Sequence, residues 1–270
     1  MRFRYVSDSH IHTDCSRDGA DPATMLCDRA AKLGLYSITI TDHCECNRYL
    51  ADGYDKSVRQ SVFEAHKASA IFNGRLRVYS GVELGQPLQE PSAVADLFGR
   101  CEFDFVLASV HNVKGKPDFF DLDYQTEDLE KVMEQYFDEV AEMVEWGEFD
   151  SLAHLTYPWR YIVGEHGIPI DDRRWEKRID EVLKLLIEKG KALEVNTSGF
   201  RQRLGVAMPP LPVLRRYRRM GGSLVTLGSD AHRWADVGAG IERGLELLRQ
   251  AGFTHFAVYV ARRPQILPVA

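Results

Sequence analysis

Short apolar segments alternate with longer amphipathic segments along most of the chain. The apolar segments are rich in β-branched residues, as expected of strands buried in a parallel sheet. We predict seven such strands, at residues 2–7, 36–41, 76–82, 103–110, 149–153, 191–195 and 223–228. Apolar residues at helical spacing predict helices at residues 22–33, 56–72, 91–99, 129–146, 172–189, 209–220 and 236–251. Repeated strand-then-helix units with short links predict an α/β fold, a parallel barrel closed on itself.

Two segments fall outside these units. Residues 114–125 contain Gly115 and Pro117 and lack a periodic pattern, which predicts a loop over the mouth of the barrel. Residues 256–260 form another apolar run, either a final strand or an extension of the sheet.

Composition limits the class of protein. The 270 residues are 44% hydrophobic and 27% charged, and we expect one barrel domain over residues 1–270. The net charge is −6, and the short cluster at residues 215–219 is the one basic run, so we expect no nucleic-acid partner. The sequence has no apolar stretch of membrane-spanning length and starts without an apolar signal region, which indicates a cytoplasmic protein with no membrane partner. The oligomeric state is not indicated.

Histidines and carboxylates follow nearly every predicted strand. Because the carboxyl ends of barrel strands form a ring, these side chains should converge at its centre. Imidazoles and carboxylates are ligands of zinc, iron and manganese, and six histidines are too many for one ion. The pattern therefore predicts two or three divalent ions held by residues from this set: His10, His12, His43, Glu83, His111, His154, Asp230 and His232.

The motifs around these residues resemble those of the PHP (polymerase and histidinol phosphatase) superfamily. The resemblance rests on His10-Ile-His12-Thr13-x-x-Ser16, Thr41-Asp42-His43, Gly81-Val-Glu83, Ser109-Val-His111, His154 and Gly228-Ser-Asp230-Ala-His232. Within the superfamily, residues 153–158 and 193–199 resemble those of the stand-alone histidinol-phosphate phosphatases of histidine biosynthesis. The resemblance implies a distorted (β/α)7 TIM-like barrel with a trinuclear metal site at the carboxyl ends of its parallel strands.

The resemblance also implies which residues hold each ion. One ion would be bound by His10, His12, Glu83 and Asp230, a second by Glu83, His111 and His154, and a third by His43, His232 and Asp18. Asp18 stands where many members of the superfamily carry a histidine, and Asp14 is a nearby alternative. We expect Asp42 to orient a ligand histidine.

The implied activity is hydrolysis of L-histidinol phosphate to L-histidinol and phosphate, a phosphoric monoester hydrolase reaction. Metal ions that share a bridging hydroxide would supply the nucleophile and clamp the phosphoryl oxygens. One guanidinium group can bind two phosphate oxygens at once. We therefore predict Arg160 and either Arg201 or Arg203 as phosphate ligands. Asn196 and Ser198 would add hydrogen bonds to the substrate. A metal-bound water, Asp18 or His232 is a candidate proton donor to the leaving alkoxide.

Three other functions are compatible with parts of the pattern. A related PHP phosphoesterase would act on nucleotide phosphates, and room for a base and ribose beside Arg160 and Arg201 would favour it. A polymerase-associated PHP module is disfavoured because the chain contains no polymerase and no basic groove. An amidohydrolase normally has eight strands and a metal-bridging lysine or carboxylate on the fourth, where this chain has His111.

Overall fold

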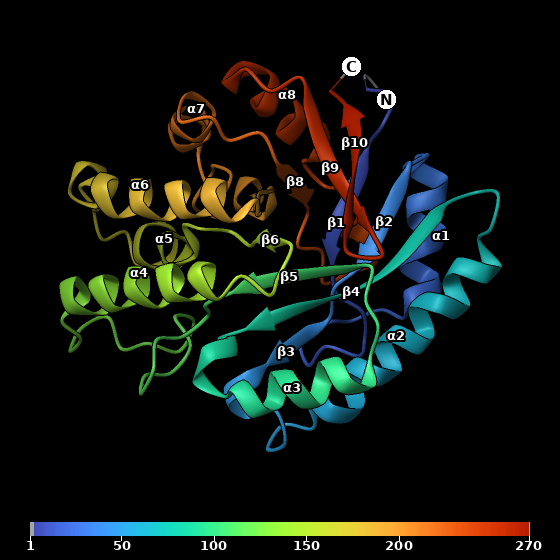
Figure 1. Cartoon of the computed structure of the whole chain (residues 1–270), viewed down its shortest axis with the longest axis horizontal. Helices are drawn as coiled ribbons and strands as arrows, with labels where there is room; N and C mark the ends of the chain where they lie inside the picture. The colour runs from blue at the N-terminus through green and yellow to red at the C-terminus, as the bar shows by residue number, and fades with distance from the viewer. Residues whose placement is uncertain (1–2, 270) are drawn as a thin grey trace.

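The computed structural model describes residues 3–269, and its main sheet is a nearly closed barrel surrounded by helices (Figure 1). Seven strands follow one another around the barrel, each hydrogen-bonded to the next in parallel: β1 (Ser7–Ile11), β2 (Ser37–Ile40), β4 (Arg77–Gly85), β5 (Phe105–Ser109), β6 (Ser151–Leu152), β7 (Ala192–Asn196) and β8 (Val225–Gly228). The predicted α/β barrel of seven parallel strands is confirmed.

The segment after β8 ties the last strand of the barrel to the first. The Asp230 N–H donates to the His10 carbonyl oxygen at 2.8 Å. The buried Asp8 carboxylate accepts hydrogen bonds from the Ser229 N–H at 2.8 Å and from the Ser229 hydroxyl at 2.5 Å. These contacts bring the two ends of the strand order together at the carboxyl edge, where the predicted ligands lie.

All the helices except the short α5, which was not predicted, lie close to their predicted ranges. The helices are α1 (Ala23–Leu33), α2 (Tyr54–Ile71), α3 (Pro91–Arg100), α4 (Leu129–Trp146), α5 (Tyr157–Trp159), α6 (Asp172–Lys189), α7 (Leu211–Arg219) and α8 (Ile241–Ala251). Gly34 and Gly147 end α1 and α4 in the left-handed conformation, with φ of 71° and 75°, which is the reason a glycine stands at each. Within residues 3–269, no helix has both the length and the apolar character needed to cross a bilayer.

The strand boundaries differ from the prediction around the first histidines. Because β1 covers Ser7–Ile11 rather than residues 2–7, His10 lies inside the strand and not after it. A further short strand, β3 (His43–Glu45), follows β2 and pairs in parallel with β4, opposite Glu83. The pattern missed β3 because three mostly polar residues carry no hydrophobic alternation.

The last apolar run belongs to a separate antiparallel hairpin rather than to the barrel. Its strands are β9 (His255–Val260) and β10 (Arg263–Pro268). Arg262, in the turn, donates from its backbone to the Asp104 carbonyl and from its side chain to the Asp150 carboxylate. Asp104 and Asp150 directly precede β5 and β6, so the hairpin covers the amino-terminal end of the barrel, opposite the histidines.

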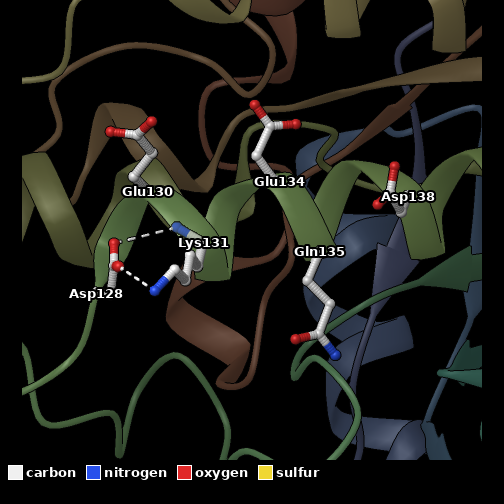
Figure 2. A pocket seen from close by; sticks show the side chains of 6 residues that line it. All are labelled: Asp128, Glu130, Lys131, Glu134, Gln135 and Asp138. Atoms are coloured by element: carbon white, nitrogen blue, oxygen red, sulfur yellow. Dashed lines mark hydrogen bonds and ion pairs between the residues drawn. The ribbon is translucent and has the colours of Figure 1, made fainter.

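Figure 2 shows a shallow hollow on the outer face of α4, lined by Asp128, Glu130, Lys131, Glu134, Gln135 and Asp138. Two arginines of α6 form ion pairs with most of the acidic residues that line this hollow. Arg174 pairs with Glu130, and Arg178 pairs with Glu134 and Asp138. The hollow is therefore part of the charged seam that joins α4 and α6.

We expect Phe137→Ala to lower the free energy of unfolding by about 3–5 kcal/mol, because Phe137 is fully buried and its removal leaves a cavity. Its ring stacks on Trp175 with centroids 5.6 Å apart. Phe63→Ala is the matched control, since Phe63 is 60% exposed and its loss should change stability by less than about 0.5 kcal/mol. Urea denaturation of both variants measures the difference, and equal effects would contradict this description of the core.

Candidate metal centre

A cavity of about 1120 Å³ opens at the carboxyl end of the barrel. Its walls include four of the predicted ligand histidines, His43, His111, His154 and His232. The predicted loop over the mouth contributes Lys116, Pro117, Asp118, Phe120 and Asp121 to the same cavity. The structure thus brings residues from most of the chain to one place, as the ring of strand ends requires.

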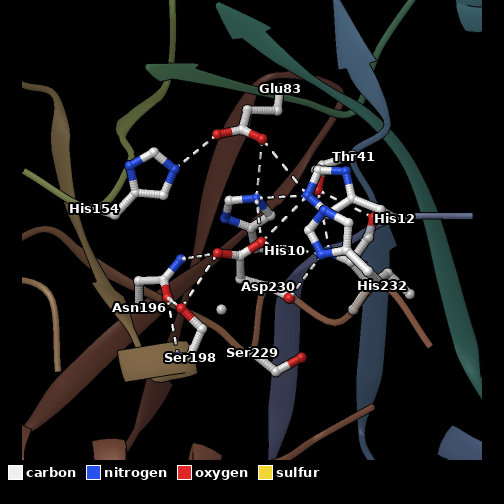
Figure 3. A network of polar contacts seen from close by, with 12 residues as sticks. His10, His12, Thr41, Glu83, His154, Asn196, Ser198, Ser229, Asp230 and His232 are labelled. Atoms are coloured by element: carbon white, nitrogen blue, oxygen red, sulfur yellow. Dashed lines mark hydrogen bonds and ion pairs between the residues drawn. The ribbon is translucent and has the colours of Figure 1, made fainter. Parts of the chain in front are cut away.

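The first predicted ligand set meets on the floor of this cavity. His10 lies in β1, and His12 directly follows this strand. Their Nε2 atoms are 2.9 Å apart. The Glu83 Oε2 atom lies 3.3 Å from His10 Nε2 and 3.5 Å from His12 Nε2. The Asp230 Oδ1 atom lies 3.8 and 3.6 Å from the same two nitrogens. Figure 3 shows the four side chains directed at one another.

The second set shares the other oxygen of the same carboxylate. Glu83 Oε1 lies 3.0 Å from His111 Nε2 and 2.8 Å from His154 Nε2. Glu83 stands in β4, between β3 and β5, so its side chain reaches both sets from the middle of the cluster. One carboxylate therefore lies between two groups of imidazoles, the arrangement of a bridging ligand.

The third set lies nearer the mouth. Asp18 Oδ2 is 3.1 Å from His232 Nε2 and 3.7 Å from His43 Nε2. The Asp18 side chain is 60% exposed, whereas both histidines are partly covered. The rings of His43 and His232 both stack against His12, with centroids 4.2 and 4.1 Å away, and lie 5.7 Å from each other. Asp14, the alternative to Asp18, is exposed and does not line the cavity.

The donor atoms fit divalent transition-metal ions. Three groups have ligand atoms within 4.8 Å of one another, namely His12 with His43 and His232, His10 with His12 and Glu83, and His43 with Glu83 and His111. The buried Nδ1 atom of His43 lies 3.0 Å from Glu83 Oε2 and 3.3 Å from Glu45 Oε1 without forming a hydrogen bond to either. A buried nitrogen that faces carboxylates in this way is suited to share a cation with them.

The carboxylates of the cluster are held ionised. Burial alone would raise the pKa of Glu83, but the nearby imidazoles of His111 and His10 hold it well below its usual range. Burial also opposes ionisation of Asp230, where the Arg160 guanidinium holds the pKa well below its usual range. Both groups are therefore available as anionic ligands.

The predicted phosphate ligand Arg160 lines the cavity and contacts the ligand cluster directly. One guanidinium nitrogen lies 2.7 Å from Asp230 Oδ2 and 2.7 Å from Ser198 Oγ. The Nε atom is buried and has no hydrogen-bond partner. The guanidinium also lies over the Tyr157 ring, 5.1 Å from its centroid.

Three predicted substrate ligands occupy other positions than expected. Arg201 does not line the cavity, because its guanidinium donates to the carbonyl oxygens of Ser229 and Asp230 at 2.6 and 2.7 Å. Asn196 and Ser198 are fully buried beneath Asp230 and bond to each other, with the Ser198 hydroxyl donating to Asn196 Oδ1 at 2.6 Å. These side chains support Asp230 in place of lining the substrate cavity. Their motif gave no sign of this, since a sequence does not give the direction of a loop side chain.

Arg203, the alternative to Arg201, lies away from the cavity, and Asp42 is linked to a ligand histidine through Ser16. Arg203 is 73% exposed and lies 3.7 Å from Glu165, outside the residues that line the cavity. The Asp42 carboxylate has no contact with a ligand histidine, but it accepts a hydrogen bond from the Ser16 hydroxyl at 2.7 Å. Ser16 Oγ in turn lies 3.3 Å from His12 Nδ1, so Asp42 acts on His12 through one intervening residue.

Two carboxylates beside the histidines were missed from the sequence. Glu45 Oε1 lies 2.9 Å from His111 Nδ1, and Glu194 Oε1 lies 2.7 Å from His10 Nδ1. Glu194 stands in the interior of β7, where a charged residue in an otherwise apolar strand is a signal that could have identified it.

Comparisons with known proteins give a consistent result. A model of the PHP domain family matches residues 8–198. A Clostridium acetobutylicum protein named "Probable histidinol-phosphatase" is 30% identical over 245 residues, which cover 90% of this chain and 92% of that protein. A Lactococcus lactis histidinol-phosphatase is 26% identical over 257 residues, 93% of each chain.

A solved structure shares the fold. The crystal structure of Lactococcus lactis histidinol phosphate phosphatase, complexed with zinc, L-histidinol and phosphate, superposes with a TM-score of 0.79. The match covers 96% of this chain and 98% of that one, at 24% sequence identity.

Asp18→Asn should weaken binding of the most weakly held zinc ion about tenfold, or about 1.4 kcal/mol, because the substitution removes an anionic oxygen beside His43 and His232. Zinc titration of chelator-stripped protein measures the affinity. Asp14→Asn is the matched control from the same loop and should bind zinc as the wild type does. Equal zinc affinities for both variants would exclude Asp18 as a ligand.

Proposed function

Because this chain belongs to the PHP domain family, we propose that it is a metal-dependent phosphatase that hydrolyses L-histidinol phosphate to L-histidinol and phosphate. The single observation that carries the proposal is the convergence of histidines and carboxylates from β1, β3, β4 and the segments after β5, β6 and β8 on one cavity. Relatives that match nine tenths of the chain bear the name histidinol-phosphatase.

Two or three divalent ions fit the three ligand sets. Zinc, iron and manganese all accept imidazole and carboxylate ligands, and the donor set alone does not choose between them. When bound, such ions activate water as a nucleophile and neutralise charge on the phosphoryl group. Glu83 would join the first two sites, since its two oxygens face different imidazoles.

Arg160 is the side chain best placed to bind the phosphoryl group. It is charged, lines the cavity and lies beside Asp230, so it can place a guanidinium next to the cations without leaving its position. Asp18 and His232 lie in contact with each other and line the cavity. Against the effect of burial, hydrogen bonds from His232 and His43 hold the pKa of Asp18 well below its usual range. His232 is therefore the better candidate of the two to hold the proton for the leaving alkoxide.

Asp118 is a suitable partner for the ammonium group of L-histidinol. Its Oδ1 accepts hydrogen bonds from the Tyr157 hydroxyl at 3.1 Å and the Phe120 N–H at 2.8 Å. Burial raises the pKa of Asp118, as expected of a carboxylate with little solvent around it. No lysine or arginine within residues 3–269 forms an ion pair with it, whereas Asp52, also in the cavity wall, already pairs with Arg17 and Arg48.

A phosphate-release screen of the metal-loaded protein tests the proposal. We expect L-histidinol phosphate to be hydrolysed with a higher kcat/KM than any member of a panel of nucleoside 3′- and 5′-phosphates. His111→Ala should reduce kcat at least about 100-fold, or about 2.7 kcal/mol in activation free energy, because it removes an imidazole beside Glu83. His66→Ala, on the surface of α2, is the control.

The screen also decides between the two phosphoesterase functions. The cavity volume accommodates a nucleotide as well as histidinol phosphate, so size does not separate them. Preferred hydrolysis of a nucleotide would replace the proposed substrate, and no hydrolysis of any phosphomonoester by metal-loaded protein would refute the proposed activity.

Asp118→Asn should raise KM for L-histidinol phosphate about tenfold, or about 1.4 kcal/mol, close to the value of a hydrogen bond to a charged group. The same variant should hydrolyse p-nitrophenyl phosphate, which has no ammonium group, with unchanged KM. Asp121→Asn, from the same loop and also in the cavity wall, is the control and should behave as wild type toward both. A parallel rise in KM for both substrates would show that Asp118 does not recognise the amine.

A further inference from the structure

Glu194 makes hydrogen bonds that link two of the three ligand sets, although it lies outside all of them. It stands in β7 with a side chain that is 1% exposed. Its Oε1 atom lies 2.7 Å from His10 Nδ1. Its Oε2 atom accepts hydrogen bonds from the His154 N–H at 2.8 Å and from the Asn196 side-chain amide at 3.2 Å. Both oxygens of the buried carboxylate are thus used.

This contact orients the His10 ring. A carboxylate oxygen accepts a hydrogen bond from an imidazole N–H, so Nδ1 is directed at Glu194 and Nε2 is the nitrogen left to bind a metal ion. That atom faces His12 Nε2 and Glu83 Oε2, at 2.9 and 3.3 Å, in the first ligand set.

Gly228 leaves the space that this contact needs. A Cβ atom at Gly228 would lie 2.3 Å from Glu194 Oε1 and 2.3 Å from His10 Cβ. Gly228 stands in β8, across from Asn196 of β7, so the two strands and β1 meet at this point. Any side chain here would push the carboxylate away from the ring.

We propose that Glu194 is a positioning residue that fixes the ring and tautomer of His10 for metal binding, and that Gly228 is required to admit this contact. The inference rests on the metal centre of the proposed function. A carboxylate behind a ligand histidine also increases the basicity of the ligand, and loss of such a partner typically weakens metal affinity about 10–100-fold.

Glu194→Gln is the direct test, because either orientation of the amide conflicts with the surrounding groups. If the amide oxygen faces His10, the NH2 group meets the N–H donors of His154 and Asn196. If the amide is reversed, the NH2 group faces His10 Nδ1 and favours the tautomer with its proton on Nε2. The variant keeps the shape of the side chain and changes only its hydrogen bonding and charge.

The experiment uses the full chain, stripped of metal and titrated with zinc in competition with a chelating dye. Glu194→Gln and Gly228→Ala should each weaken zinc binding at one class of site about 10–100-fold. Asp150→Asn is the control for loss of a buried carboxylate, since Asp150 lies at the opposite end of the barrel. Gly81→Ala is the control for a crowded glycine, because its Cβ would meet residues 39, 41 and 105 and no histidine. Both controls should keep the zinc affinity of the wild type even if their melting temperatures fall.

A second measurement reads the His10 hydrogen bond in the zinc-loaded protein. Proton–nitrogen NMR spectra detect imidazole N–H groups, and the His10 Nδ1–H signal is identified by its loss in His10→Ala. We expect a downfield, slowly exchanging Nδ1–H signal in the wild type and in Asp150→Asn, and its loss or upfield shift in Glu194→Gln. A role confined to stability would leave this signal unchanged.

The outcomes separate this inference from the proposed function. Unchanged zinc affinity in Glu194→Gln, an unchanged His10 Nδ1–H signal in that variant, or a wild type that takes up no zinc would each overturn it. A wild type that binds zinc and fails to hydrolyse histidinol phosphate would overturn the proposed substrate alone, because neither measurement here uses a substrate.

Discussion

The buried carboxylate of Glu83 is the group around which the site is organised. It is fully buried near the carboxyl end of β4, yet its pKa is held low by the imidazoles around it. A buried anion of this kind is costly unless it is paired and hydrogen-bonded, so the histidines and the carboxylate depend on one another. The carboxyl ends of the barrel strands must therefore hold their relative positions closely, because a displacement of any one strand leaves part of this charge unpaired.

The scaffold meets this requirement with further buried polar groups behind the ligands. Asp8 ties β1 to the segment after β8, Asp42 holds the Ser16 hydroxyl, and Glu194 holds His10. Arg201 fixes the carbonyl oxygens of Ser229 and Asp230, where Asp230 has a φ of 55°, an uncommon value for a residue with a side chain. Backbone strain at a predicted ligand is a recurrent feature of functional sites, and here several hydrogen bonds hold the strained residue in place.

The sequence was most informative where a possible metal ligand stood at the end of a predicted strand. Seven apolar runs, six of which end near histidines or carboxylates, were enough to predict the barrel and the convergence of His10, Glu83 and His154. The short strand β3 could not be predicted, because its pairing depends on the neighbouring β4 and not on its own pattern. The directions in which loop side chains point could not be predicted from the sequence either. Arg160 and Arg201 follow similar motifs, yet one faces the cavity and the other faces the backbone.

The candidate metal ligands and the residues of the outer cavity come from different parts of the fold. The ligand sets belong to the strands and to the residues that directly follow them, where the barrel fixes side-chain positions to within a narrow range. Asp118, Phe120 and Tyr161, which line the outer part of the cavity, come from the long loop after β5 and the segment after α5. Loops can change without disturbing the strands that carry the metal ligands. Under the proposed function, these outer residues would therefore select the phosphomonoester. Asp118, a partly desolvated carboxylate without a cationic partner among the described residues, is the one that we propose binds the amine of the substrate.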